Sequence, residues 1–349
     1  REAFALPKLT AEFASPGMGS FYGGLGYVFA ATRGVGTPDG LTFNRPDAID
    51  NEFAYGGWKS GGLTPSLGTD VVDISWGRQG FEVGDGFLIA DGNSERFRKA
   101  TLYLGPRTSF ERAGLLRINT RPVRFDAFYL ESDHDFDDPH LFGGNAELIN
   151  ETYGTLGVYG FRIFDADPAT TRDGLRVVSV RGEGNPLAYF GVENSHFAFE
   201  YADQHNGETS RQADARGWHA TAGYTFSDLP WMPDITYRFS HFSGDDPNTS
   251  ENETFDPLFV AGPGVGTWFQ GEITGQYLLA NANLDVHMVA LSATPTEGLN
   301  LGLQFFNFTL DEPGAQTPAT GFSAVSSDDF GDEINVFAEI SAFDHLTVM

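Results

Sequence analysis

The sequence predicts an all-β protein, a transmembrane antiparallel up-and-down β-barrel formed as one domain by residues 1–349. Three observations predict this fold: apolar and polar residues alternate with a period of two, the alternating segments are long, and short connections alternate with long ones. Helical periodicity is scarce. We count about sixteen candidate strands; because a barrel must pair its edge strands, we expect about 18 in the intact barrel, with its C-terminal part missing from this sequence.

Each alternating segment has one apolar face and one polar or small face. In PVRFDAFYLE (122–131), Phe125 and Tyr129 share one face, while Arg124 and Asp126 share the other. A soluble sandwich also alternates, with its apolar face inward. The segments here run to roughly ten residues, against about five or six for ordinary globular strands, which favours an apolar face turned toward lipid. The same pattern recurs in residues 69–77, 216–227, 234–242 and 332–342.

The connections predict one rim of tight turns and one rim of long loops, as in bacterial outer-membrane barrels. We expect the long, acidic loops to be extracellular, in contact with lipopolysaccharide, and the barrel to lie in outer-membrane lipid. The short connections are NTRP (119–122), SDLPWMP (227–233) and TPTEG (294–298); the long ones are residues 131–147, 243–257 and 311–329.

Composition excludes several classes of function. The formal charge of −27 argues against nucleic acid, which needs clustered Lys and Arg. The absence of cysteine excludes disulfides, zinc-thiolate sites and cysteine nucleophiles. Acidity is also typical of a soluble or salt-adapted surface, so it does not by itself indicate a membrane. The five tryptophans, with many Tyr and Phe, predict interfacial aromatic girdles.

Three segments resemble the alginate-export family of Gram-negative outer-membrane barrels. They are residues 73–93 (DISWGRQGFEVGDGFLIADGN), 103–131 (YLGPRTSFERAGLLRINTRPVRFDAFYLE) and 255–284 (FDPLFVAGPGVGTWFQGEITGQYLLANANL). The resemblance implies a monomeric 18-stranded barrel through which secreted alginate, an anionic uronate polysaccharide, leaves the cell. It also implies a constricted, arginine-rich lumen with loops that act as gates.

Alternation and resemblance together select candidate pore-lining residues. A guanidinium group donates two parallel hydrogen bonds to one carboxylate and stays charged at any relevant pH, so arginine suits the binding of a polyuronate. Four arginines alternate with apolar neighbours along their strands, and three more come from the family-like segments. One of these three, Arg78, stands between glycines, where a bulge would turn it inward. A ladder of salt bridges that only stabilises the barrel is the alternative. The candidates are Arg78, Arg107, Arg112, Arg117, Arg124, Arg162 and Arg238.

The same alternation turns acidic residues inward. Mixed charge is typical of a general porin constriction, so the substrate stays open between an anionic polysaccharide or oligosaccharide and small hydrophilic solutes. A scaffold barrel that anchors periplasmic or surface partners through its acidic loops is a third reading. The acidic lining candidates are Asp126, Glu200 and Glu272, accompanied by Asp73, Asp285 and Glu339.

Other chemistry finds little support. Asp133, Asp135 and Asp137 begin a D-x-D-x-D calcium loop, but Asp138 and Gly144 stand where an EF-hand needs glycine and glutamate. A loose surface calcium site and a solvated acidic loop both remain open. No G-x-S-x-G elbow is present, and no spacing singles out paired carboxylates. We therefore predict a passive diffusion channel rather than an enzyme, without a cofactor.

Overall fold

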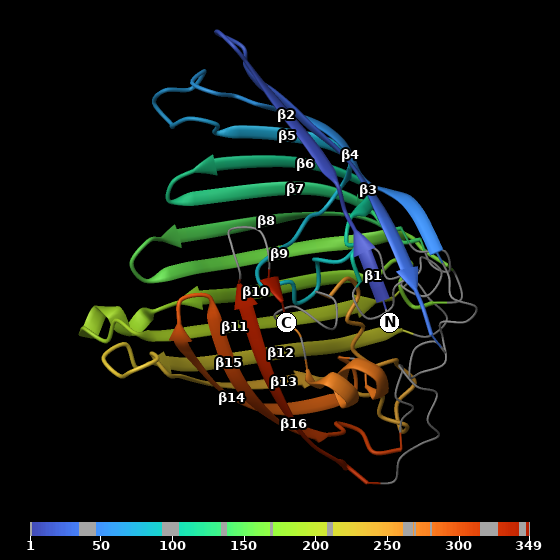
Figure 1. Cartoon of the computed structure of the whole chain (residues 1–349). Coiled ribbons are helices and arrows are strands. Elements are labelled where there is room, and N and C mark those ends of the chain that lie inside the picture. The colour runs from blue at the N-terminus through green and yellow to red at the C-terminus, as the bar shows by residue number, and fades with distance from the viewer. Residues whose placement is uncertain are drawn as a thin grey trace.

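Seventeen β-strand segments form one sheet in the computed structural model (Figure 1). The structure describes residues 2–34, 47–92, 105–133, 138–167, 170–207, 212–260, 268, 270–279, 281–314, 327–341 and 347–348. Within these ranges, helix is confined to the 3₁₀-helix η1 (Pro186–Phe190) and the π-helix η2 (Gly271–Leu278), and neither is long enough to cross a membrane.

The strands run from one end of the chain to the other. The first eight are β1 (Glu2–Ala5), β2 (Lys8–Ser15), β3 (Gly19–Thr32), β4 (Asp47–Lys59), β5 (Val72–Gln79), β6 (Phe110–Thr120), β7 (Val123–Glu131) and β8 (His140–Asn150). The others are β9 (Gly154–Asp165), β10 (Arg176–Gly184), β11 (Ser195–Asn206), β12 (Ala213–Thr225), β13 (Asp234–Phe242), β14 (Leu284–Thr296), β15 (Leu299–Thr309), β16 (Asp329–Ser341) and β17 (Thr347–Val348).

The sheet is an up-and-down meander, as the sequence predicts. From β3 onward each strand pairs antiparallel with the next one in the chain. β1 and β2 both pair with β3, at residues 29–32 and 19–26, so seventeen segments fill sixteen positions. Within the described ranges no pairing joins β2 to β16, and the wall curves between these two strands (Figure 1).

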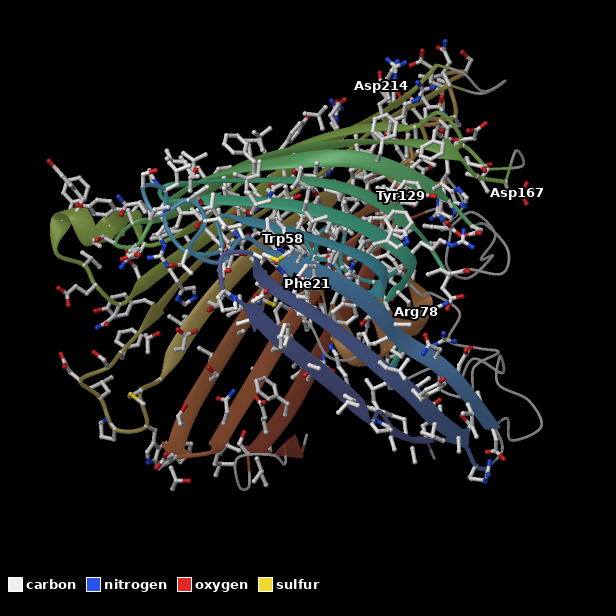
Figure 2. The ribbon with its side chains drawn as sticks, turned by 90° about the horizontal axis from the view of Figure 1, so that it is seen from above. Phe21, Trp58, Arg78, Tyr129, Asp167 and Asp214 are labelled. Carbon is white, nitrogen blue, oxygen red and sulfur yellow. The ribbon has the colours of Figure 1, made fainter. Side chains whose placement is uncertain are left out.

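The apolar face of the strands is turned outward. On β10, Val178 and Val180 are 60% and 48% exposed, whereas Ser179 and Arg181, which alternate with them, are buried. Phe21 and Trp58, cross-strand neighbours on β3 and β4, lie side by side in the view from above (Figure 2). A soluble sandwich would reverse this arrangement, so the exposed apolar surface is the one that lipid covers.

Replacing Val180 with arginine should lower the free energy of unfolding from lipid vesicles by about 2–4 kcal/mol, because a charge at mid-depth on the lipid face is poorly solvated. Val180 is the central residue of β10. The control is Val192→Arg, at an exposed site in the connection between β10 and β11, which should change little. Equal costs for the two variants would contradict the outward assignment.

Connections alternate between the two rims. One rim, here the short-turn rim, carries residues 16–18, 121–122, 151–153 and 297–298. The other, the long-loop rim, lies at the end of the wall where β5 leads to β6, β13 to β14 and β15 to β16. Asp167 and Asp214, both at the long-loop rim, lie at the same end of the molecule (Figure 2).

One predicted loop is too long. Residues 140–147 belong to β8 rather than to the connection after β7. Residue 143 in this range is a glycine that makes room for neighbouring side chains. A Cβ on Gly143 would lie 2.6 Å from Cζ of Phe128 and 2.6 Å from Cβ of Phe161. The glycine therefore marks close packing within the sheet.

Two segments from the long-loop rim fold into the lumen, the space that the wall surrounds. We call residues 80–92 the first inner segment and residues 255–260 the second inner segment. They join through a parallel bridge between Ile89 and Phe259, and the amide N–H of Phe259 donates to the carbonyl of Leu88 at 3.1 Å. Figure 1 shows the first inner segment, in teal, crossing inside the strands.

The hydrophobic core lies between these inner segments and the inner surface of the wall. The wall residues of this apolar level lie at or close to strand ends on the long-loop rim. They are Phe110, Leu130, Leu141, Ile163, Val177, Phe242, Leu284 and Phe308, all buried. Along this part of the wall the lumen is therefore apolar and filled. Alternation alone predicts a lumen that is polar along its whole length, so the structure differs from the prediction here.

Candidate functional site

Below the apolar level, toward the short-turn rim, the lumen wall is charged. Arg117 on β6 stands between two acids of neighbouring strands, being the cross-strand partner of Asp73 on β5 and of Asp126 on β7. Its Nη1 lies 3.9 Å from Asp73 Oδ2, and its guanidinium lies 5.7 Å from the ring centre of Phe81. Tyr22 donates its hydroxyl proton to Asp73.

Arg124 continues this charged level on β7. Its Nε donates to Asp126 Oδ1 at 3.1 Å, and its Nη1 lies 3.8 Å from Glu147 Oε2 on β8. Asn145 joins the two acids, donating to Asp126 Oδ2 and to Glu147 Oε1 at 2.9 Å each. Arg117 and Arg124 keep 27% and 31% of their side-chain surface exposed, so both remain accessible from the lumen.

Arg181 on β10 closes the row, and sequence reasoning missed it. Its Nη2 donates to Glu147 Oε1 at 2.6 Å. Two glycines make room for the guanidinium: a Cβ on Gly157 or on Gly84 would lie 2.9 Å from the Arg181 side chain. The signal was present in RVVSVRGEG (176–184), where Ser179 and Arg181 alternate with exposed valines.

A second group of charges lies at the long-loop rim around Arg107. Its buried guanidinium donates to Glu52 Oε2 at 3.0 Å, to Asp50 Oδ2 at 2.9 Å and to Asp133 Oδ2 at 2.8 Å. Glu52, fully buried, also accepts the backbone N–H groups of residues 108 and 109 at 2.9 Å each. This network ties β4 to the connections before β6 and after β7.

Arg78 joins the same network through a bulge. The pairing of β5 with β6 shifts between Gly77 and Gln79, and Gly77 has a φ of 130°, a conformation that favours glycine. The Arg78 guanidinium then donates to Asp133 Oδ2 at 2.7 Å. The carboxylate of Asp133 is therefore held by two arginines, which leaves less of its charge for calcium. Asp135 and Asp137, the other calcium candidates, lie outside the described residues.

Arg238 and Glu200 are buried on the lumen face. The Arg238 guanidinium lies 4.8 Å from the ring centre of Trp268. Glu200 Oε1 accepts the Tyr159 hydroxyl at 2.5 Å and the Ser179 hydroxyl at 2.8 Å. Trp268 is buried against Phe87 and therefore does not belong to the interfacial girdle in which we expect the tryptophans. The side chain of Glu272, the remaining acidic candidate, lies outside the described part of the chain.

Two of the candidate pore-lining arginines do not face the lumen. Arg162 pairs with the exposed Phe142, and its neighbours Phe161 and Ile163 are the buried, inward residues. Around Arg162 the inward-facing residues are apolar, because they pack in the hydrophobic core. The alternation rule, which assigns apolar residues to the outer face, therefore gives the wrong face for Arg162. Arg112 is the cross-strand partner of Glu131, which lies on the same face of β7 as Tyr129. The Arg112 guanidinium donates to Glu131 Oε1 at 2.6 Å. Both arginines lie on the outer face.

An ion pair fastens the second inner segment to the wall. Arg172, in the connection between β9 and β10, donates to Asp256 Oδ2 at 2.7 Å and to Oδ1 at 2.8 Å. Although burial raises the pKa of Asp256, the charge and hydrogen bonds of Arg172 outweigh it and hold the pKa below its ordinary value. Protonation at low pH therefore weakens this attachment.

Fold and site together define a class: an outer-membrane β-barrel channel, with lipid-facing apolar strands and a lumen of paired charges. Among solved structures, the chain is similar to the OmpF porin of Salmonella typhi in complex with daunomycin, at 13% identity, a TM-score of 0.51, and coverage of 96% of this chain and 89% of that one. It also matches a Rhodopseudomonas blastica porin mutant at 8% identity, a TM-score of 0.48, and coverage of 97% and 89%.

The family follows from the sequence itself. The family model for alginate export matches residues 66–349, so the chain belongs to the alginate-export family. No curated protein matches it. The fold and the family point to a transport channel in the bacterial outer membrane, surrounded by lipid and lipopolysaccharide, rather than to an enzyme.

Proposed function

We propose that this protein is a passive channel for an anionic polysaccharide or its oligosaccharides, of the alginate type. The observation that carries the proposal is the row of inward guanidinium groups at one level of the lumen, Arg117, Arg124 and Arg181. Membership of the alginate-export family supports the substrate class. No cofactor takes part in such a passage.

The row would act by exchanging carboxylates. Each arginine already contacts an acid of the wall, so its charge is balanced when the lumen holds only water. A uronate carboxylate that reaches Arg117 or Arg124 replaces a wall carboxylate as hydrogen-bond acceptor, and the guanidinium loses little solvation. The chain of sugars then moves from one arginine to the next.

The paired charges also favour a second candidate, a general porin for small hydrophilic solutes. Asp73, Asp126 and Glu147 offset the three arginines one for one. A lumen of this kind has little net preference for anions, and mixed charge at a constriction is typical of porins. Recordings in planar bilayers separate the two: block by uronate oligomers supports the first candidate, and an unblocked, weakly selective current supports the second.

The decisive variant neutralises the two accessible arginines. Arg117→Gln with Arg124→Gln should weaken the block by uronate oligomers at least about tenfold, because each hydrogen bond between charged groups contributes about 1.5–3 kcal/mol. The matched control is Arg112→Gln on the outer face, which should leave the block unchanged. Unchanged block in the double variant would contradict a role for these arginines in substrate passage.

We further propose that the long-loop rim faces the outside of the cell and that the chain acts as a monomer. The acidic connections on that rim support the orientation, since divalent cations held by lipopolysaccharide would screen them. Added protease should therefore cleave these loops in intact cells. Cleavage only after the outer membrane is opened would reverse the orientation.

A further inference from the structure

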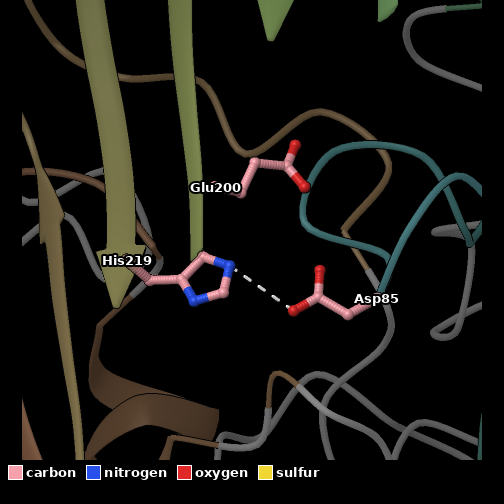
Figure 3. A group of neighbouring side chains, drawn as sticks. All are labelled: Asp85, Glu200 and His219. Carbon is pink, nitrogen blue, oxygen red and sulfur yellow. Dashed lines mark ion pairs between the residues drawn. The ribbon is translucent and has the colours of Figure 1, made fainter. Parts of the chain in front are cut away.

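Three potential metal ligands meet where the first inner segment touches the wall. Asp85 comes from that segment, Glu200 from β11 and His219 from β12 (Figure 3). One ligand atom from each lies within 4.8 Å of the other two. The three residues come from parts of the chain far apart in sequence, so only the folding of the segment into the lumen brings them together.

His219 points to a ligand. Its side chain is buried, with 3% of the residue exposed, and neither ring nitrogen has a hydrogen-bond partner among the described residues. An imidazole buried without partners loses its bonds to water and gains none in return. Binding a cation through a ring nitrogen would satisfy it.

The distances fit a small cation. His219 Nε2 lies 3.5 Å from Asp85 Oδ2, which is long for a hydrogen bond. Two tetrahedral ligands, each about 2.1 Å from zinc, lie about 3.4 Å apart. The three side chains also line a cavity of about 10 Å³, close to the room that one water or one ion needs.

We propose that Asp85, Glu200 and His219 bind a zinc-like divalent cation. An imidazole with two carboxylates is a donor set typical of zinc and its neighbours, whereas calcium and magnesium prefer oxygen alone. The hydroxyl groups of Tyr159 and Ser179 hold Glu200 in orientation, as hydrogen bonds to metal-binding carboxylates commonly do. A fourth position remains for water.

The charges around the site set its strength. The two carboxylates balance a dication, and Arg181, which lines the same cavity, is balanced by Glu147. Arg238 and His219 both pack against the ring of Trp268, at 4.8 Å and 4.7 Å from its centre, so the positive charge of Arg238 lies near the site and opposes the metal. We therefore expect micromolar rather than nanomolar affinity. A bound ion would link the first inner segment to two strands of the wall.

The test uses the full chain in detergent, stripped of metal by a chelator and titrated with Zn²⁺ alone. We expect one equivalent to bind with micromolar affinity, and His219→Gln or Asp85→Asn should weaken its binding at least tenfold. Matched controls come from two other clusters of a histidine with two acids, His140 with Glu131 and Asp138, and His241 with Asp285 and Asp311. His140→Gln and His241→Gln should leave the micromolar binding of this equivalent unchanged.

Two results would overturn the site: the native chain binds no Zn²⁺ below millimolar concentration, or binding survives His219→Gln. A second measurement leaves the proposed ligands in place, in case the His219 or Asp85 variants fail to fold. X-ray absorption of the chain with both His140→Gln and His241→Gln and one equivalent of Zn²⁺ should show a single imidazole and oxygen ligands at about 2.0–2.2 Å. A spectrum with no imidazole, or with two, would equally exclude this ligand set.

Discussion

Replacing Phe87 with alanine is expected to raise the fraction of time that the channel is open, and with it the mean current. Phe87 is buried at the centre of the apolar level, with its ring centre 4.9 Å from that of Trp268, 5.7 Å from Phe255 and 5.9 Å from Phe242. It thereby joins both inner segments to β13. No other aromatic residue of the first inner segment makes as many ring contacts in the described structure.

The size of the effect follows from packing. Removing a buried phenylalanine costs about 3–5 kcal/mol, and here the loss falls on the contact between the inner segments and the wall. Because each 1.4 kcal/mol changes an equilibrium about tenfold, the fraction of channels with the segments displaced should rise about a hundredfold or more until it saturates. Single-channel recording in planar bilayers measures this fraction directly.

The control for Phe87 is Tyr189→Ala. Tyr189 is exposed on η1 at the short-turn rim, and its ring contacts only Phe190 and Tyr153 among the described aromatic residues. Its loss should leave the current unchanged. A folded Phe87→Ala protein with the wild-type current would mean that the inner segments do not limit passage.

Replacing Arg107 with alanine should lower the free energy of unfolding by about 3–5 kcal/mol, because the substitution leaves buried carboxylates without a positive partner. Glu52 is fully buried and Arg107 is its ion-pair partner at 3.0 Å. Urea unfolding in detergent, followed by tryptophan fluorescence, measures the loss. Adding Glu52→Gln to Arg107→Ala should recover part of it, since the second change removes the stranded charge.

Arg121→Ala is the matched control for Arg107. Arg121 also pairs with an acid, Glu151, but its side chain is 86% exposed at the short-turn rim. Exposed ion pairs add little to stability, since water solvates both charges. Equal destabilisation by the two substitutions would show that burial of the Arg107 network does not matter.

Alternation predicted the strands well, because the two faces of a barrel wall meet different solvents. Phe125 and Val180 face outward and Asp126 faces inward, as the period of two requires. The same rule misassigned Arg162, since Phe161 and Ile163 pack in the apolar core instead of facing lipid. Local sequence does not reveal this, because the packing depends on residues 80–92 and 255–260, far away in the chain.

The face of the wall on which the strand arginines lie was predictable to the same degree. Arg117, Arg124 and Arg238 stand within regular strands, and their neighbours place them on the lumen face. Arg107 lies outside any strand, so only the family resemblance singled it out. The meeting of Asp85 with Glu200 and His219 had no local signal at all, since it arises from the path of the first inner segment.

The aromatic contacts that hold the inner segments have a consequence for recordings over time. Close-packed rings lose their attraction within a small displacement, so such an interface has two stable arrangements and resists intermediate ones. Single-molecule current traces should therefore jump between discrete values with measurable dwell times. Shortening the dwell in the lower state, without altering either plateau, is the signature that a weakened ring cluster should leave.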